Sequence, residues 1–263
     1  MEPASRASRA TRATALDWWS TYFSGDYLTE FEPLFDLETD RRQVSRLIDV
    51  LGLPAGSRVL DCPSGQGRHA HLLAEAGFNV DGLDYSPDLL AKARERGTGA
   101  GLRYLQGDMR RLPPRWARRF DAVVNLFTSF GFFTDPNDDA RVIQGFARVL
   151  RPGGTLVWHG GSRDGLMAAF LAKDWWTTSN GTSVLQARSF DPLGGILTVH
   201  STLTAPGRKP VNRDHRIRIY TATRLAELCR DAGLIVEEAY DGWTARPLRR
   251  TSSEMLLVAR KRM

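Results

Sequence analysis

From Arg58 to about residue 160, short apolar runs alternate with segments of helical period. The apolar runs predict strands, and we assign them to RVLDC, FNVDGLD, LRYLQGD, FDAVVNLF and TLVWHG. Helices are predicted between these strands: from Gly67 to Ala76, after a Ser86 cap with Pro87 at the first helical position, and from Asp135 to Leu150. A regular alternation of this kind is typical of a parallel α/β sheet with helices on both faces.

The alternation of strands and helices stops between about residues 174 and 220. Here SVLQARSF and GILTVHSTL flank a glycine-containing turn, and HRIRIY alternates strictly, so we expect an inserted antiparallel lid of about three strands. A last helix, from about Thr221 to Gly233, leads back to LIVEEAY and EMLLVARK. An aromatic-rich segment and a helix ending near Leu51 precede the sheet.

Length and composition fit one folded domain. The chain has 263 residues, 42% hydrophobic and 25% charged, without an apolar run long enough to cross a bilayer. We therefore expect a soluble protein, with a disordered basic leader over residues 1–14 and one domain over residues 15–263. No membrane partner is expected, and the oligomeric state is left as monomer or homodimer.

The net charge of +6 comes from 36 basic and 30 acidic residues. Much of the basic excess lies in the leader and the C-terminal tail, without interleaved aromatic residues, so a nucleic-acid partner is unlikely. Only Cys62 and Cys229 are present, too few for a disulfide framework and wrongly spaced for zinc. The sequence thus favours a cytoplasmic protein without a metal site.

The stretch VLDCPSGQG combines a buried strand, an acid and a glycine turn before a helix. Asp61 ends the strand, and Gly65 and Gly67 permit positive φ and a close approach of a ligand to the backbone. A helix N-terminus behind such a turn favours a nucleotide or another polar ligand. Taken alone, the G-x-G pattern is weak evidence, and a tight structural turn remains as an alternative.

Two further acids follow the next two strands. Asp84 lies near the offset at which an acid reaches the hydroxyls of a ribose. Asp108 can accept a hydrogen bond from an exocyclic adenine amine, and Met109 beside it can contact the ring. Because the carboxyl ends of parallel strands share one edge of the sheet, the three acids should face one crevice.

Through these residues, the chain resembles the class I S-adenosylmethionine-dependent methyltransferases. VLDCPSGQG, GLDYS, LQGDM, FDAVVNLF and VLRPGG are similar to the successive motifs of that family, in order and spacing. The resemblance implies a Rossmann-like seven-stranded sheet whose last strand is antiparallel, and S-adenosylmethionine as the cofactor. It implies Asp61 and Gly65 near the amino-acid end of the cofactor, Asp84 at the ribose and Asp108 at the adenine. The further cofactor residues that we expect are Gly67, Tyr85, Met109, Asn125, Leu126 and, on an N-terminal flap, Tyr22 and Tyr27. Ser64 departs from close relatives, which often have Cys there.

NLFTSFGFF and RIYTATRLAEL resemble a bacterial group that methylates small molecules under an antiparallel cap. The expected reaction is therefore an in-line displacement that moves a methyl group to a nitrogen or oxygen of a small metabolite. NLFTSF lacks the D/N-P-P-Y pattern used on nucleic-acid bases, which argues against a nucleic-acid methyltransferase. An NAD(P)-dependent oxidoreductase, which shares the glycine fingerprint, and a non-catalytic cofactor-binding subunit remain as alternatives.

Candidates for catalysis and acceptor binding rest on weaker patterns. His159 follows the fifth strand and is our choice of general base, and Asn125 could accept from an acceptor amine; either side chain could equally be structural. Arg163, on the same rim, and His215 and Arg218, on the lid, are candidates for substrate binding, with a solvated outer face as the alternative for the lid arginine. Arg68, His69 and His71 are expected on a helix surface.

Overall fold

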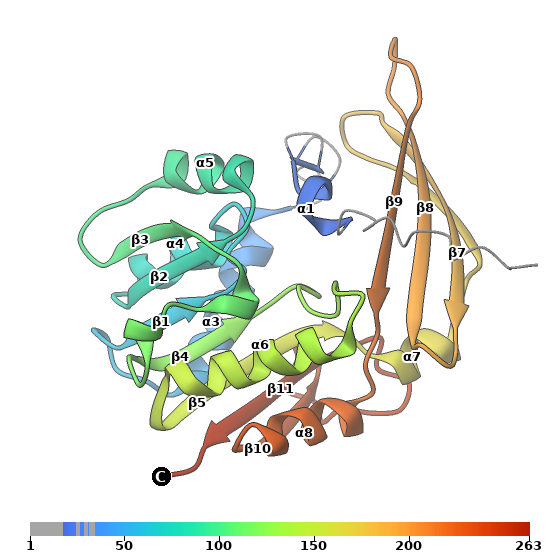
Figure 1. Ribbon diagram of the computed structural model, residues 1–263. Coiled ribbons are helices and arrows are strands. Elements are labelled where there is room, and N and C mark those ends of the chain that lie inside the picture. The colour runs from blue at the N-terminus through green and yellow to red at the C-terminus, as the bar shows by residue number, and fades with distance from the viewer. Residues whose placement is uncertain (1–17, 25–26, 29–30, 32–34) are drawn as a thin grey trace, which may run out of the picture.

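The computed structural model of the protein describes residues 18–24, 27–28, 31 and 35–263. The expected disordered leader over residues 1–14 lies outside these ranges. The described residues form a large mixed sheet and a smaller antiparallel sheet that stands beside it (Figure 1). No helix in these ranges is both long and apolar enough to span a membrane.

The large sheet has seven strands in the order β10-β11-β5-β4-β1-β2-β3. β11, the last strand of the chain, runs antiparallel to both of its neighbours, β10 and β5, whereas the other pairs are parallel, as the family resemblance implies. The strands are β1 (Arg58–Asp61), β2 (Asn79–Asp84), β3 (Leu102–Gln106), β4 (Phe120–Asn125), β5 (Leu150–Gly161), β10 (Leu234–Asp241) and β11 (Glu254–Lys261). The predicted Rossmann-like fold class is confirmed.

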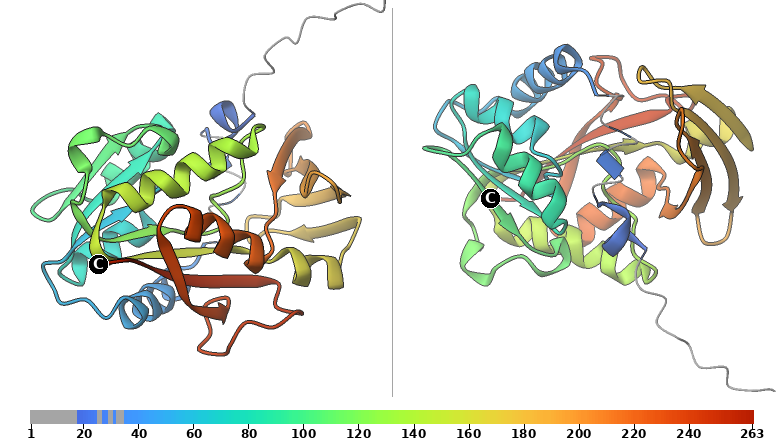
Figure 2. Two further views of the ribbon diagram at one scale, coloured as in Figure 1. Left: turned by 60° about the horizontal axis from the view of Figure 1, so that its bottom comes forward. Right: turned by 90° about the horizontal axis from the view of Figure 1, so that it is seen from above.

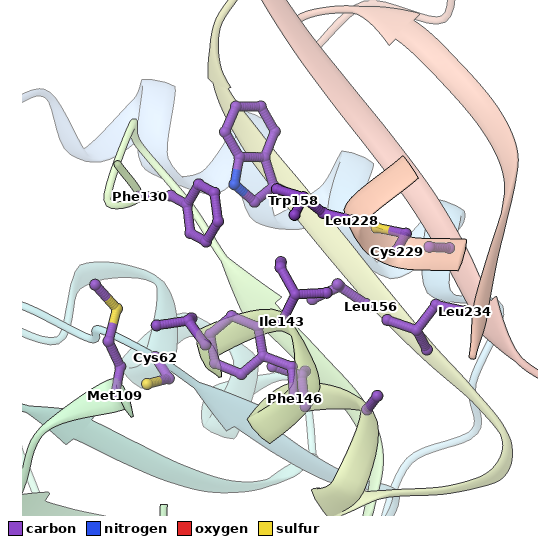
Figure 3. Close-up of a cluster of buried hydrophobic side chains, with 14 of the residues drawn as sticks. Cys62, Met109, Phe130, Ile143, Phe146, Leu156, Trp158, Leu228, Cys229 and Leu234 are labelled. Atoms are coloured by element: carbon purple, nitrogen blue, oxygen red, sulfur yellow. The ribbon is translucent and has the colours of Figure 1, made fainter. Parts of the chain in front are cut away.

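Helices cover both faces of this sheet, and each face has its own apolar core. One core lies under α3 (Leu37–Leu51), α4 (Arg68–Glu75) and α5 (Pro87–Arg96). The other lies under α6 (Pro136–Val149) and α8 (Ala222–Asp231), where Phe146, Ile143 and Leu156 pack together (Figure 3). The shorter helical elements are α1 (Trp19–Tyr22), η2 (Met109–Arg111), η3 (Pro114–Trp116) and α7 (Arg163–Ala168).

The helices begin where the capping residues of the sequence predict. Ser86 accepts a hydrogen bond from the backbone of Leu89, with Pro87 at the first position of α5. Asp135 caps α6 in the same way by accepting from the backbone N–H of Asn137. These local signals place the loops that precede α5 and α6 at the edge of the sheet where the strand-end acids lie.

The smaller sheet has four strands, so the expectation of about three was one too few. They are β6 (Lys173–Thr177), β7 (Ser183–Asp191), β8 (Ile196–Thr204) and β9 (Val211–Arg218), paired antiparallel in that order. The missed strand is β6, because KDWWT is short and its two tryptophans hide the alternation of polar and apolar residues. Seen from above, α1 lies between the two sheets (Figure 2).

Candidate functional site

A cleft of about 980 Å³, including its open mouth, lies at the carboxyl ends of β1, β2 and β3. Its wall contains most of the residues predicted to bind the cofactor, namely Asp61, Gly65, Asp84, Tyr85, Asp108, Met109, Leu126 and Tyr27. Residues scattered over the sequence therefore meet in one cavity.

Asp84 is fixed by two backbone hydrogen bonds. Its Oδ2 accepts from the backbone N–H of Gly65 at 2.7 Å, and its Oδ1 accepts from that of Ser86 at 2.8 Å. The carboxylate thus ties the glycine loop to the start of α5, while the lone pairs that remain on its two oxygens are free for a ligand. A pair of ribose hydroxyls fits this acceptor.

Burial gives Asp61 and Asp84 unusual acidities. Desolvation, together with the nearby charge of Asp84, raises the pKa of Asp61 to about 8, and desolvation raises that of Asp84 to about 6. Buried carboxylates of this kind are stabilised in their charged form by a cation. The sulfonium and ammonium groups of S-adenosylmethionine would supply positive charge, so the residues present fit the expected cofactor.

Asp108 has a partner that the sequence did not reveal. Its carboxylate pairs with Arg110 at 2.7 Å and accepts from the backbone N–H of the same residue at 2.8 Å. Arg110 also reaches Asp138, at 2.9 Å, and its guanidinium lies over the rings of Trp19 and Phe133. Asp108 is therefore held in place at the cavity wall beside Met109.

Gly67 does not line the cavity, although Gly65 does. It adopts φ +75° at the start of α4, and a Cβ added there would lie 2.4 Å from Oη of Tyr104. The absence of a side chain at this position is thus required by the packing of α4 on β3 rather than by a ligand.

Aromatic residues of the N-terminal segment close one side of the cavity. Trp19, Phe23 and Tyr27 are part of its wall, whereas Tyr22 is not. The hydroxyl of Tyr22 instead meets Nδ1 of His215 at 3.2 Å, and its ring packs on that imidazole. Tyr22 therefore joins α1 to the lid, and the structure does not support our assignment of this residue to the cofactor.

Asn125 and His159, the expected catalytic residues, lie behind the wall. Asn125 is fully buried, and its Nδ2 donates to the carbonyls of Cys62, at 2.8 Å, and Ser129, at 3.2 Å. Nδ1 of His159, a residue only 2% exposed, accepts from the backbone N–H of Phe127 at 3.3 Å. Neither side chain reaches the cavity, so the geometry argues against direct roles for both.

His159 instead supports a strained turn. Phe127 and Thr128 have φ angles of +61° and +59°. These values lie in the left-handed region, which residues other than glycine rarely adopt. The imidazole accepts from the Phe127 backbone, and the His159 carbonyl accepts from that of Thr128 at 3.1 Å. On its far side, Nε2 of His159 meets Glu254 at 3.3 Å. This histidine holds Phe127 in the cavity wall.

The rim and lid residues predicted to bind substrate also have structural partners. Nη1 of Arg218 pairs with the fully buried carboxylate of Asp139 at 2.7 Å, and Tyr220 donates to the same oxygen at 2.7 Å. Arg163 donates to the carbonyl of Pro192 at 3.1 Å. The pair with Asp139 fastens the lid to α6, and the contact of Arg163 ties α7 to the β7–β8 turn of the lid. Neither arginine is part of the cavity wall formed by the described residues. His215 is neutral near pH 7, because burial lowers its pKa to about 4.

Sequence reasoning missed part of the cavity wall. Arg68 and His69 were expected on a helix surface, but the Arg68 side chain is only 9% exposed, His69 is buried, and both line the cavity. His71 lies on the surface as expected and pairs with Glu75. The phenylalanines of NLFTSFGFF also form part of the wall, through Phe127, Phe132 and Phe133. Their density in one short loop was the available signal.

Comparison with known proteins identifies the family. Residues 59–154 match the model of a methyltransferase domain. A dTDP-3-amino-3,4,6-trideoxy-alpha-D-glucopyranose N,N-dimethyltransferase of Streptomyces venezuelae is 30% identical over 232 residues, which cover 85% of this chain and 90% of that enzyme. A glycine/sarcosine N-methyltransferase of Halorhodospira halochloris is 29% identical over 160 residues, which are 60% of each chain.

Solved structures share the fold over nearly the whole chain. The CcbJ methyltransferase of Streptomyces caelestis superposes with a TM-score of 0.79 at 22% identity, covering 93% of this chain and 99% of that one. CalS10, an amino pentose methyltransferase of Micromonospora echinaspora, gives a TM-score of 0.69 at 20% identity, covering 90% and 96%. The cavity, the motifs and these likenesses agree: the chain belongs to the S-adenosylmethionine-dependent class I methyltransferases and is an enzyme of that family.

Proposed function

We propose that the protein transfers a methyl group from S-adenosylmethionine to the amine of a small amino sugar. The observation that carries the choice of an amine is the lack of a suitable base in the described part of the cavity wall. The three acids there are assigned to the cofactor, and burial lowers the pKa of His69 to about 3. An amine with a modest pKa can react without a base, whereas a hydroxyl would need one.

A sugar is supported by the polar inner face of the lid. The register aligns Arg188, Val199 and His215 across three strands, and the next row brings together Gln186, Ser201 and Arg213. Gln186 Nε2 donates to Ser201 Oγ at 3.1 Å, and Arg188 donates to Gln186 Oε1 at 2.7 Å. Donors and acceptors so closely spaced suit the hydroxyls of a sugar. The N,N-dimethyltransferase of Streptomyces venezuelae, named for an amino sugar nucleotide, matches across this region.

The chain's own residues would act by binding, orienting and shielding. S-adenosylmethionine supplies an electrophilic methyl group when bound. Asp61 and Asp84 would supply negative charge and hydrogen-bond acceptors at the strand ends, and Phe127 and Phe132 would supply an apolar part of the wall that keeps water out. Positioning of this kind can contribute roughly 7–11 kcal/mol to a displacement reaction. This arrangement supports transfer to an amine, which needs no general base in the described cavity wall.

The test uses two acceptors that differ in one group. A dTDP-linked 3-amino-3,6-dideoxyhexose and the corresponding 3-hydroxy sugar are incubated separately with enzyme and methyl-labelled cofactor, and the products are analysed by mass spectrometry. We expect label on the amine only. Label on the hydroxyl sugar, or on neither sugar, would reject the proposal. Total RNA and DNA serve as further acceptors, because label in those fractions would revive the nucleic-acid alternative.

We also propose that the enzyme works in the cytoplasm as a monomer or homodimer. The two cysteines, both buried and free, are consistent with a reducing compartment. Light scattering of the purified protein measures the oligomeric state, and a larger assembly would contradict this part of the proposal.

A further inference from the structure

Arg68 is the only lysine or arginine in the cavity wall formed by the described residues. It is the first residue of α4, directly behind the glycine loop, and it shares the wall with Asp61 and Gly65. No side chain caps the N-terminus of this helix. The guanidinium thus lies at the end of the cavity where the family resemblance places the amino-acid part of the cofactor.

The Arg68 side chain is held rigidly. Nη1 pairs with Oδ1 of Asp40 on α3, and both side chains are more than nine-tenths buried. The guanidinium packs against two rings, with its Cζ 3.9 Å from the centroid of Phe35 and 4.8 Å from that of Phe127, and these two rings also meet each other edge to face at 5.7 Å. A cation held against two aromatic rings in this way keeps its charge and its direction inside an apolar wall.

Most N–H donors of the Arg68 guanidinium have no acceptor among the described residues. A guanidinium has five N–H donors, yet within the described ranges its one hydrogen-bond acceptor is Asp40. A buried ion pair that served only stability could be replaced by apolar residues at little cost, so its presence in a ligand cavity points to use of the remaining donors.

We propose that Arg68 binds the α-carboxylate of the cofactor's amino-acid end. A planar guanidinium matches a carboxylate with two parallel hydrogen bonds. Asp61 on the neighbouring strand supplies the opposite charge for the ammonium group, so the two side chains together match a zwitterion. Arg68 contacts Asp40, Phe35 and Phe127, and the ionisable groups of Tyr27, Asp61 and Arg96 are also near it. Among these described neighbours, none comes from β6–β9. An anionic group of the acceptor, which would face the lid, is therefore the less favoured occupant.

The test compares two ligands that differ only in this carboxylate. S-adenosylhomocysteine and its decarboxylated analogue, 5′-(3-aminopropylthio)-5′-deoxyadenosine, are titrated by calorimetry into the intact protein. Wild type should bind S-adenosylhomocysteine at least about tenfold more tightly. The double variant Arg68→Met with Asp40→Asn leaves no unpaired buried charge, and it should bind both ligands with the affinity that wild type shows for the analogue.

Asp40→Asn alone is the matched control, because it keeps the guanidinium against the rings of Phe35 and Phe127 and should retain the preference for S-adenosylhomocysteine. Arg42 is exposed and lies on α3 with Asp40, so Arg42→Met should leave both affinities unchanged. The proposal is overturned if a folded double variant keeps the preference, if both ligands weaken equally, or if only the acceptor KM rises. Each of these results leaves the amine-methylation test untouched, since that test reads the position of the label in wild-type product.

Discussion

Replacing Asp84 by asparagine should separate cofactor binding from stability. The carboxylate is 6% exposed and accepts two backbone hydrogen bonds, from Gly65 and Ser86. Burial raises its pKa from 3.8 to about 6. At about 1.4 kcal/mol per tenfold change in acidity, this corresponds to roughly 3 kcal/mol of native-state stability that is present below about pH 4 and lost as the pH rises through 6.

The Asp84→Asn variant should not lose this stability as the pH rises, because its side-chain amide does not ionise. Its NH₂ group replaces one acceptor oxygen, however, and leaves one backbone N–H unsatisfied at a cost of about 1–3 kcal/mol. The two effects nearly cancel near neutral pH, so the free energy of unfolding should change by less than about 2 kcal/mol. Between about pH 4 and pH 7 the stability of the variant should fall less steeply than that of wild type.

Cofactor affinity should respond far more strongly. Loss of hydrogen bonds from ribose hydroxyls to a charged acceptor costs about 1.5–3 kcal/mol, which raises the Kd of S-adenosylhomocysteine by roughly tenfold to 150-fold. Urea unfolding at several pH values and calorimetry measure the two quantities on the same preparation. An unchanged Kd in a folded Asp84→Asn variant would show that this carboxylate only ties the glycine loop, and the ribose assignment would fail.

Three more predictions concern residues whose roles the structure revised. Arg218→Met leaves Asp139 buried without its cation and should lower the free energy of unfolding by about 3–5 kcal/mol in urea titrations. Gly67→Ala places a Cβ against Tyr104 at a positive φ and should cost about 1–3 kcal/mol, part of which Tyr104→Phe restores in thermal unfolding. His159→Asn keeps an acceptor for the backbone N–H beside it and should retain kcat within about threefold, whereas His159→Leu should lose about tenfold or more.

Each of these predictions has a clear contrary result. Arg216 lies on the same strand as Arg218 but is exposed, so Arg216→Met should leave stability unchanged, and an equal loss in both variants would contradict the role of the buried pair. A Gly67→Ala protein as stable as wild type would show that α4 can shift away from Tyr104. If His159→Asn and His159→Leu lose activity equally, with loss of a limb of the pH–rate profile, then the imidazole acts as a base after all.

The sequence by itself determined the sheet, its helices and the cofactor end of the cavity. Strand period, capping residues and glycine turns are local features, and an acid at the end of each parallel strand must reach the same edge of the sheet. For this reason Asp61, Asp84 and Asp108 could be assembled into one crevice from their positions along the chain. The side chains there follow from backbone geometry over only a few residues.

Tertiary structure alone decided which other side chains reach that crevice. Arg68 follows the glycine loop as a helical residue, and nothing in its neighbourhood along the chain shows that Asp40 and Phe35 will bury it. Arg218 has the period of a pocket residue but is taken up by Asp139, which lies 79 positions away in the chain. Such choices depend on packing between elements distant in sequence, where a single buried partner outweighs any local pattern.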